Sequence, residues 1–281
     1  LEFRRVLFRS IEMSYSVSGS IAILLYLIAA VGLGRLLAQG ISCFDHPRNG
    51  FKLLGAVGVV LHTYVLYTLV VEQWVNLGFF HALSVTGWLL VLLFESTWIF
   101  RPVGNLGIII FPVSSVALLL QILYPEPSLK TASSELDIHI LLSMVAYSLL
   151  AVAALQAVLL AVQEKHLRNK QPGGIIRALP PMQEVEHLMF QLVRAGLVVL
   201  TLALLSAVPL VEDIVAQKRA HTAALSILSW LLFAALLWGR HQYGWRGRTA
   251  VRWTLFGFGI LFLSYFGSRF VVEFLVSTPA S

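Results

Sequence analysis

Four histidines lie inside or at the ends of long apolar stretches of this sequence. They are His62, His81, His139 and His221. Because a polar side chain among apolar neighbours is costly without a partner, histidines in such places often hold a ligand or transfer a proton. A neutral imidazole is a good axial ligand for haem iron. It can also form one hydrogen bond to a neighbouring helix, so iron ligation, proton transfer and a purely structural role all stay open.

The apolar stretches that hold these histidines set the fold class. Eight of them, each of roughly 17 to 26 residues, are about long enough to cross the hydrocarbon core of a bilayer. Backbone amides in lipid must be paired within their own segment unless a barrel closes, and these stretches lack the alternation of barrel strands. The sequence therefore predicts an all-α, polytopic membrane bundle of about eight transmembrane helices. The predicted spans are residues 17–38, 53–71, 78–100, 103–124, 136–163, 188–211, 222–239 and 253–276.

Composition agrees with a single membrane domain. Hydrophobic residues make up 58% of the chain and charged residues 12%, which is far from the balance of a water-soluble domain. We expect residues 14–281 to form one transmembrane domain. Residues 1–13, with three arginines among bulky apolar residues, are expected to be a non-native or disordered N-terminal segment. Cys43 is the only cysteine, which excludes an intramolecular disulfide and a paired-cysteine thiol relay.

Lysines and arginines are distributed unequally between the two sets of loops. Twelve fall at one set, and Lys130, Lys218 and Arg219 fall at the other. By the positive-inside rule the first set is cytoplasmic, so a multi-pass inner-membrane protein with both termini outside is predicted. This bias accounts for the net charge of +6 and gives no indication of nucleic-acid binding. The twelve are Arg35, Arg48, Lys52, Arg101, Lys165, Arg168, Lys170, Arg177, Arg240, Arg246, Arg248 and Arg252.

The same topology places the histidines at two depths. His62 lies about nine residues into its span, roughly 14 Å from the cytoplasmic end and near the midplane. His81, His139 and His221 fall near outward ends and share one level. Since His62 and His139 differ in depth by about 10 Å or more, any two histidines that share one iron are expected to come from the outward three.

Charged residues near span ends have simpler explanations. Arg269 comes one turn before Glu273 near the outward end of the last span, where it can snorkel, pair with that glutamate, or bind a carboxylate or propionate. Glu95, near the inward end of its span and followed by Arg101, is also expected to snorkel. No phosphate-binding loop, zincin helix or serine-nucleophile elbow occurs in the sequence, and we expect no enzymatic activity.

Several segments resemble a known family. The fifth span, from His139 through the run Ala-Tyr-Ser-Leu-Leu-Ala-Val-Ala-Ala-Leu-Gln (residues 146–156), is similar to the YpjD-like inner-membrane proteins of the cytochrome c assembly superfamily, which also includes CcsA, CcmC and HemX. So are the C-terminal runs Trp-Gly-Arg (238–240), Gly-Trp-Arg-Gly-Arg (244–248) and Tyr-Phe-Gly-Ser-Arg (265–269). The resemblance implies an eight-helix bundle and a link to haem handling or cytochrome c maturation.

Only some functional residues of the haem transporters in that superfamily have a counterpart in this sequence. His139 matches the first external histidine of the haem transporters, and His62 matches a membrane histidine loosely. The tryptophan-rich segment of those transporters has no counterpart, because the loop at residues 212–221 contains no tryptophan. Trp238 stands where a second membrane histidine would be. The resemblance therefore implies membership of the superfamily and not the haem-export mechanism of those transporters.

The resulting hypothesis is a non-enzymatic inner-membrane protein that binds haem or assists haem delivery during cytochrome c maturation. His139 is the first candidate for the iron ligand, followed by His62 and His221. The propionates would reach Lys218, Arg219 or Arg269, and the expected partners are the lipid bilayer, haem and cytochrome maturation proteins. Two alternatives stay open: a transporter subunit for an ion or small solute, with His62 as a relay, and a membrane scaffold for another complex.

Overall fold

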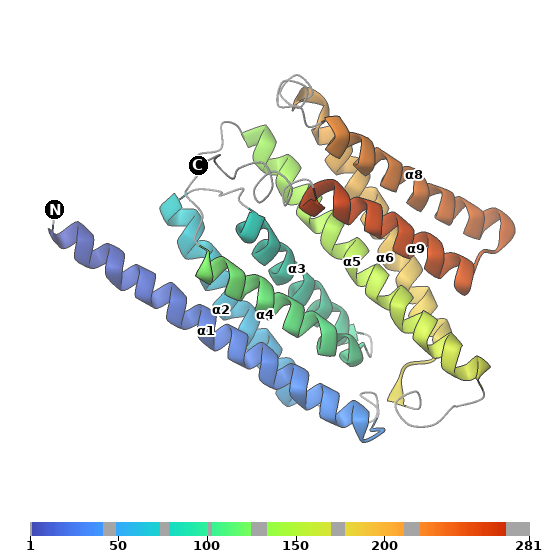
Figure 1. The fold of residues 1–281 in the computed structure, drawn as a ribbon, viewed down its shortest axis with the longest axis horizontal. Helices are drawn as coiled ribbons and strands as arrows, with labels where there is room; N and C mark the ends of the chain where they lie inside the picture. Colours follow the sequence, from blue (N-terminus) through green and yellow to red (C-terminus); the bar gives the residue numbers. More distant parts are fainter. Residues whose placement is uncertain are drawn as a thin grey trace, which may run out of the picture. The chain divides into compact units, whose positions relative to one another are not determined.

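The computed structural model describes residues 2–41, 49–73, 79–100, 103–124, 134–169, 178–210 and 220–267. The regular structure in these ranges is helical (Figure 1). Eight of the described helices are long and apolar enough to cross a membrane, which confirms the predicted all-α polytopic fold. Their candidate spans are Tyr15–Ala38, Gly50–Thr68, Phe79–Ile99, Gly104–Leu123, Ile138–Arg168, Met182–Ser206, His221–Tyr243 and Arg248–Gly267.

The chain divides into two compact units, which we call unit 1 and unit 2. Unit 1 comprises residues 1–131 and 172–180, and unit 2 comprises residues 132–171 and 181–281. Two expectations stay predictions: that residues 1–13 are a non-native or disordered segment, and that residues 14–281 form one transmembrane domain. The helices of unit 1 are α1 (Glu2–Ala38), α2 (Asn49–Gln73), α3 (Phe79–Phe100), the 3-10 turn η1 (Gly104–Leu106) and α4 (Gly107–Leu123). Those of unit 2 are α5 (Ser134–Arg168), α6 (Met182–Ser206), the 3-10 turn η3 (Val208–Leu210), α8 (Ala220–Tyr243), α9 (Arg248–Phe262) and η4 (Leu263–Gly267).

Aromatic side chains form the centre of unit 1, where α1 packs on α2 and α4, and α3 packs on α4. The Tyr26 ring stacks on Phe111 at 5.5 Å between centroids, and Phe94 meets Phe111 edge-on at 5.4 Å. All three side chains are buried. Gly58 makes room for this cluster, because a Cβ there would lie 2.5 Å from Cε1 of Tyr26.

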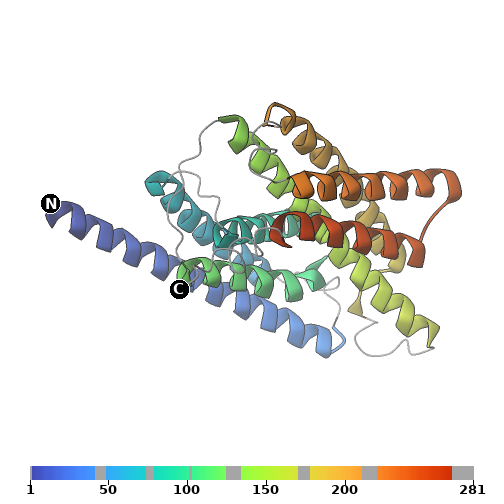
Figure 2. The same ribbon diagram turned by 45° about the horizontal axis from the view of Figure 1, so that its top comes forward.

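Unit 2 is built on the antiparallel pair α5 and α6, with α9 packed against α5 and α8 (Figures 1 and 2). Small residues let these helices approach, as is usual in membrane proteins. A Cβ at Gly196 would lie 2.7 Å from Leu150, and one at Gly257 would lie 3.2 Å from the Phe233 ring. Leu150 and Phe233 are fully buried, so each fills the space that a glycine leaves.

Several helices begin earlier than the predicted spans do, and α6 and α9 show why. α6 begins at Met182, directly after Pro181, and α9 begins at Arg248, directly after Gly247. Gly247 has a φ of 56°, a conformation that favours glycine and that ends the preceding turn. Hydropathy identifies only the apolar part of a helix, and the first turns of α6 and α9 carry charged residues. The spans predicted from the sequence therefore begin several residues after the two helices do.

Candidate functional site

His139 lies one turn inside α5 and faces the last turn of α6. Its Nδ1 atom lies 2.9 Å from the carbonyl oxygen of Ala203 and 3.1 Å from Oγ of Ser206. A carbonyl oxygen can only accept, so Nδ1 carries the ring proton. The Ser206 hydroxyl donates its own hydrogen to the same carbonyl at 2.8 Å and is therefore free to accept from Nδ1. These three hydrogen bonds fix one tautomer of His139.

In that tautomer the Nε2 atom of His139 holds a lone pair. No protein group in the described part of the chain is recorded as its partner, and the side chain is only half-buried. Histidines that ligate metals almost always donate their other ring N–H to a carbonyl or carboxylate, which fixes the ring and raises its basicity. His139 therefore has the hydrogen bonding of a metal-ligating histidine, with its lone pair on Nε2.

His221 lies at the same end of unit 2 as His139. It is the second residue of α8 and is exposed. The level of His221 along the helix axes can be compared with that of His139 because one hydrogen bond joins the two helices. The Tyr147 hydroxyl of α5 hydrogen-bonds Ser226 of α8. Tyr147 comes about 12 Å after His139 along α5, and Ser226 comes about 7.5 Å after His221 along α8, at a rise of 1.5 Å per residue. The two histidines thus lie within about 5 Å of one level along the helices.

A cluster of hydroxyl groups fastens α8 and the C-terminal end of α9 to α5. The Oγ atoms of Ser226 and Ser264 lie 2.8 Å apart, and Ser264 donates to the Thr222 carbonyl at 2.8 Å. The Tyr147 hydroxyl bonds both serines. Ser264 belongs to η4, a five-residue π-helix, and such irregular turns often occur at functional sites. This cluster was not predicted from the sequence, although three hydroxyl side chains within apolar spans, Tyr147, Ser226 and Ser264, were a usable signal.

His62, the second candidate ligand, is fully buried inside unit 1. Its Nε2 atom lies 3.0 Å from Oγ of Ser84 on α3, and the centroid of its ring lies 6.2 Å from that of Tyr26 on α1. Its Nδ1 atom is buried without a hydrogen-bond partner among the described residues. A porphyrin is far larger than an imidazole, so this closely packed position does not fit haem as an axial site.

His81 belongs to the same interior as His62. The two are on neighbouring helices, and His81 lies one turn before Ser84 on α3. The side-chain nitrogen of Gln121 on α4 lies 3.1 Å from Nδ1 of His81, and an amide nitrogen can only donate, so the His81 proton is on Nε2. The sequence prediction grouped His81 with His139 and His221 because all three lie at a similar depth in the membrane. In the structure His81 belongs to unit 1, and the other two belong to unit 2.

Glu95 differs from its expected snorkelling geometry. One carboxylate oxygen, Oε1, is buried without a partner in the described ranges. It occupies the space beside Gly55, where a Cβ would overlap with it. Lys52 reaches into the same end of unit 1, with Nζ 3.1 Å from the Trp98 carbonyl and 5.2 Å from the centre of the Trp98 ring. The Glu95 carboxylate can point into the interior because Gly55 of α2 has no side chain in the space that the carboxylate occupies.

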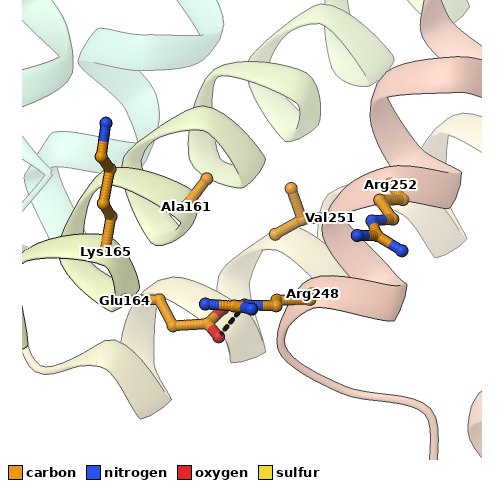
Figure 3. A pocket seen from close by; sticks show the side chains of 6 residues that line it. All are labelled: Ala161, Glu164, Lys165, Arg248, Val251 and Arg252. Carbon is orange, nitrogen blue, oxygen red and sulfur yellow. Dashed lines mark hydrogen bonds and ion pairs between the residues drawn. The ribbon is translucent and has the colours of Figure 1, made fainter. Parts of the chain in front are cut away.

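The opposite end of unit 2 is held by two ion pairs. Arg240 contacts Glu186 at 2.7 Å and lies 3.7 Å over the Phe190 ring, and Arg248 contacts Glu164 at 2.5 Å. Figure 3 shows the second pair beside a cavity of about 190 Å³. Its lining residues are Ala161, Glu164, Lys165, Arg248, Val251 and Arg252.

The three predicted propionate contacts, Lys218, Arg219 and Arg269, lie outside the described residues. Within the described ranges, no group of three or more histidine, cysteine, aspartate or glutamate side chains could hold a metal ion.

Comparison with known proteins places these observations in a family. The family model described as "Cytochrome C assembly protein" matches residues 51–276 of this chain. The chain is 37% identical over 138 residues to inner membrane protein YpjD of Escherichia coli K12, which covers 49% of this chain and 52% of that protein. A 28.8 kDa protein of Azospirillum brasilense is 34% identical over 143 residues, covering 50% and 53%.

A third relative is more distant but matches over a longer range. Protein HemX of Brevibacillus brevis is 21% identical over 226 residues, covering 75% of this chain and 83% of HemX. The chain spans about half the length of the first two relatives. No solved structure matches. Because the family model covers most of the chain, including all of unit 2 up to residue 276, this multi-pass membrane protein belongs to the cytochrome c assembly protein family.

Proposed function

We propose that this protein binds haem at the end of unit 2 where α5 begins, with His139 as the iron ligand. Membership of the cytochrome c assembly family supports the choice of cofactor. The observation that carries the choice of residue is the 2.9 Å contact between Nδ1 of His139 and the Ala203 carbonyl. This contact leaves the lone pair on Nε2, and an axial ligand needs an unprotonated ring nitrogen.

The surroundings of His139 suit an apolar, flat cofactor. Ile138 and Leu141 on α5, and Leu202 and Leu205 on α6, are exposed apolar side chains near the same helix ends. They can contact the faces or edges of a porphyrin without leaving the apolar layer. His221, exposed at a similar level, is the candidate for a second axial ligand.

The role that we propose is non-enzymatic. Haem supplies the redox and ligand chemistry when it is bound, and the protein holds it. The Ala203 carbonyl and the Ser206 hydroxyl orient the His139 ring and make Nε2 a stronger donor. We further propose that the protein lies in the inner membrane with this end outward, where haem is delivered during cytochrome c maturation.

His62 is not part of this proposal, because its ring is fully buried and already contacts Ser84. The cationic partners of the propionates also remain predictions from sequence. They are Lys218, Arg219 and Arg269.

A haem titration of the purified protein in mild detergent tests the proposal. The wild type should show a Soret band that grows to saturation, and His139→Gln should weaken haem binding by about tenfold or more. His166→Gln is the matched control, because His166 is a histidine at the other end of the same helix and is also only partly buried. Its Nδ1 also bonds a backbone carbonyl, that of Val162, at 2.9 Å. Absence of a Soret band after titration, or equal binding by wild type and His139→Gln, would overturn the proposal.

A further inference from the structure

A row of polar side chains runs through the interior of unit 1, between apolar neighbours on all four helices. Four of its buried polar atoms have no hydrogen-bond partner among the described residues: Tyr26 Oη, His62 Nδ1, Glu95 Oε1 and Gln121 Oε1. Burying an unpaired polar group costs free energy, so nearly all such groups in proteins are hydrogen-bonded to protein or to bound water. Because these four atoms belong to one row, they call for a shared explanation.

One face of α2 brings the first part of this row together. Gly55, Gly58 and His62 follow at intervals of three and four residues, which places them on one side of the helix. The Glu95 carboxylate fills the space beside Gly55, and the Tyr26 ring fills the space beside Gly58. The Tyr26 and His62 ring centroids are 6.2 Å apart. Glu95, Tyr26 and His62 therefore lie in sequence along the interior face of α2.

The row continues from His62 towards the other end of α3. Nε2 of His62 lies 3.0 Å from Oγ of Ser84, and His81 lies one turn further along α3. Gln121 of α4 then bonds His81 at 3.1 Å. From His81 to Glu95 is fourteen residues of helix, or about 21 Å of a hydrocarbon core that is about 30 Å thick.

Both ends of the row come close to the ends of the spanning helices. His81 is the third residue of α3. At the other end, the Lys52 ammonium beside Trp98 comes from the first turn of α2. The row thus connects two helix ends through a closed apolar interior, and ionisable groups inside a membrane usually mark an ion or proton pathway.

The chemistry of the members selects protons over larger ions. Carboxylate, phenol, imidazole and hydroxyl groups can each give up or accept a proton. Within the described residues no cluster of three or more metal-ligating side chains occurs. Unpaired polar atoms in an apolar interior are places where bound water forms two to four hydrogen bonds, and such water would complete the gaps between Glu95, Tyr26 and His62.

We propose that unit 1 conducts protons across the membrane along Glu95, Tyr26, His62 and Ser84, with bound water between them and with His81 and Gln121 lining the end of the path. In each transfer one O–H or N–H bond breaks and the next one forms. His62 takes up a proton at Nδ1 and releases the proton on Nε2 towards Ser84, after which the ring returns to its first tautomer. One proton enters at one end for each that leaves at the other, driven by the membrane potential or pH difference, and no oxidant or reductant is needed.

Reconstituted vesicles test this proposal with the full chain. A potassium gradient with valinomycin imposes a membrane potential, and a trapped pH-sensitive dye reports proton entry. Wild-type vesicles should acidify faster than protein-free vesicles. Tyr26→Phe and Glu95→Gln, which keep side-chain size, should each slow the flux by about tenfold, as expected for roughly 1.4 kcal/mol of added barrier.

The matched controls are the same substitutions at exposed positions. Tyr67→Phe on α2 and Glu184→Gln on α6 should leave the flux at the wild-type value, because both side chains are exposed. Equal flux in wild-type and protein-free vesicles would overturn the proposal, and so would wild-type flux in Tyr26→Phe and Glu95→Gln. A measurement that needs no variant is the flux in D₂O, which should be slower than in H₂O; equal rates would contradict transfer along a chain of hydrogen bonds.

Discussion

The Nδ1 atom of His139 on α5 lies 2.9 Å from the carbonyl oxygen of Ala203 on α6. Since the carbonyl can only accept, this one contact fixes where the ring carries its proton and which nitrogen is free for a ligand. Ser206 completes the arrangement by contacting both groups. The candidate iron ligand is therefore held by the antiparallel pair of helices that forms the base of unit 2.

Removing the Ser206 hydroxyl should weaken haem binding without abolishing it. Ser206→Ala leaves the Ala203 contact in place but removes one of two acceptors for the His139 proton. Groups that orient a ligand in this way typically change affinity by about 10- to 100-fold, and we expect the lower value. A haem titration monitored at the Soret band measures it. Ser96→Ala, at an exposed serine that bonds only its own helix at 2.7 Å, should bind haem as the wild type does.

The hydroxyl cluster of unit 2 should contribute to stability. Ser264→Ala leaves the buried Tyr147 hydroxyl and Ser226 with one partner fewer, which should lower the free energy of unfolding by about 1–3 kcal/mol. Thermal unfolding in detergent, followed by circular dichroism, measures the change. An unfolding temperature equal to that of the wild type would show that the cluster does not hold α8 to α5.

The glycines of unit 1 should differ sharply in their tolerance of alanine. A Cβ at Gly58 would lie 2.5 Å from the buried Tyr26 ring, so Gly58→Ala should destabilise the protein by about 1–3 kcal/mol. Gly34 of α1 and Gly259 of α9 have open space around the added atom. Alanine there should be neutral or stabilise by about 0.5–1 kcal/mol, since glycine is a poor helix former. Equal effects at Gly58 and Gly34 in the same unfolding assay would contradict the packing described for Tyr26.

The two ion pairs of unit 2 should contribute unequally. Arg248 is half exposed where it meets Glu164, so Arg248→Gln should change stability by less than about 1 kcal/mol, and less still at high salt. Arg240 also covers the Phe190 ring at 3.7 Å, so Arg240→Gln loses a ring contact that salt screens less. Unfolding at low and high salt measures both. A larger loss at Arg248 than at Arg240 would reverse this ranking.

Apolar length was enough to predict the fold class but not the interior of each unit. The eight spans follow from the thickness of the bilayer, and His139 stands out as the leading histidine of its span. Side-chain direction does not follow from hydropathy. Glu95 was expected to snorkel because it lies near a span end, yet it turns inward beside Gly55. The spacing of Gly55, Gly58 and His62 along one helix face was a usable signal.

Two further features could not be predicted from the sequence because they depend on tertiary structure. The division of the chain into two units separates His81 from His139 and His221, whereas depth alone had grouped them. Tyr26 was missed for a different reason. A tyrosine within an apolar span is usually a packing residue, and only its buried, unpaired hydroxyl distinguishes it.

The most direct test of the central claim is an experimental structure of the haem-loaded protein. We expect Nε2 of His139 to bond the iron while Nδ1 keeps its hydrogen bond to the Ala203 carbonyl. Haem whose iron is held by another residue, with the His139 ring turned away, would contradict it.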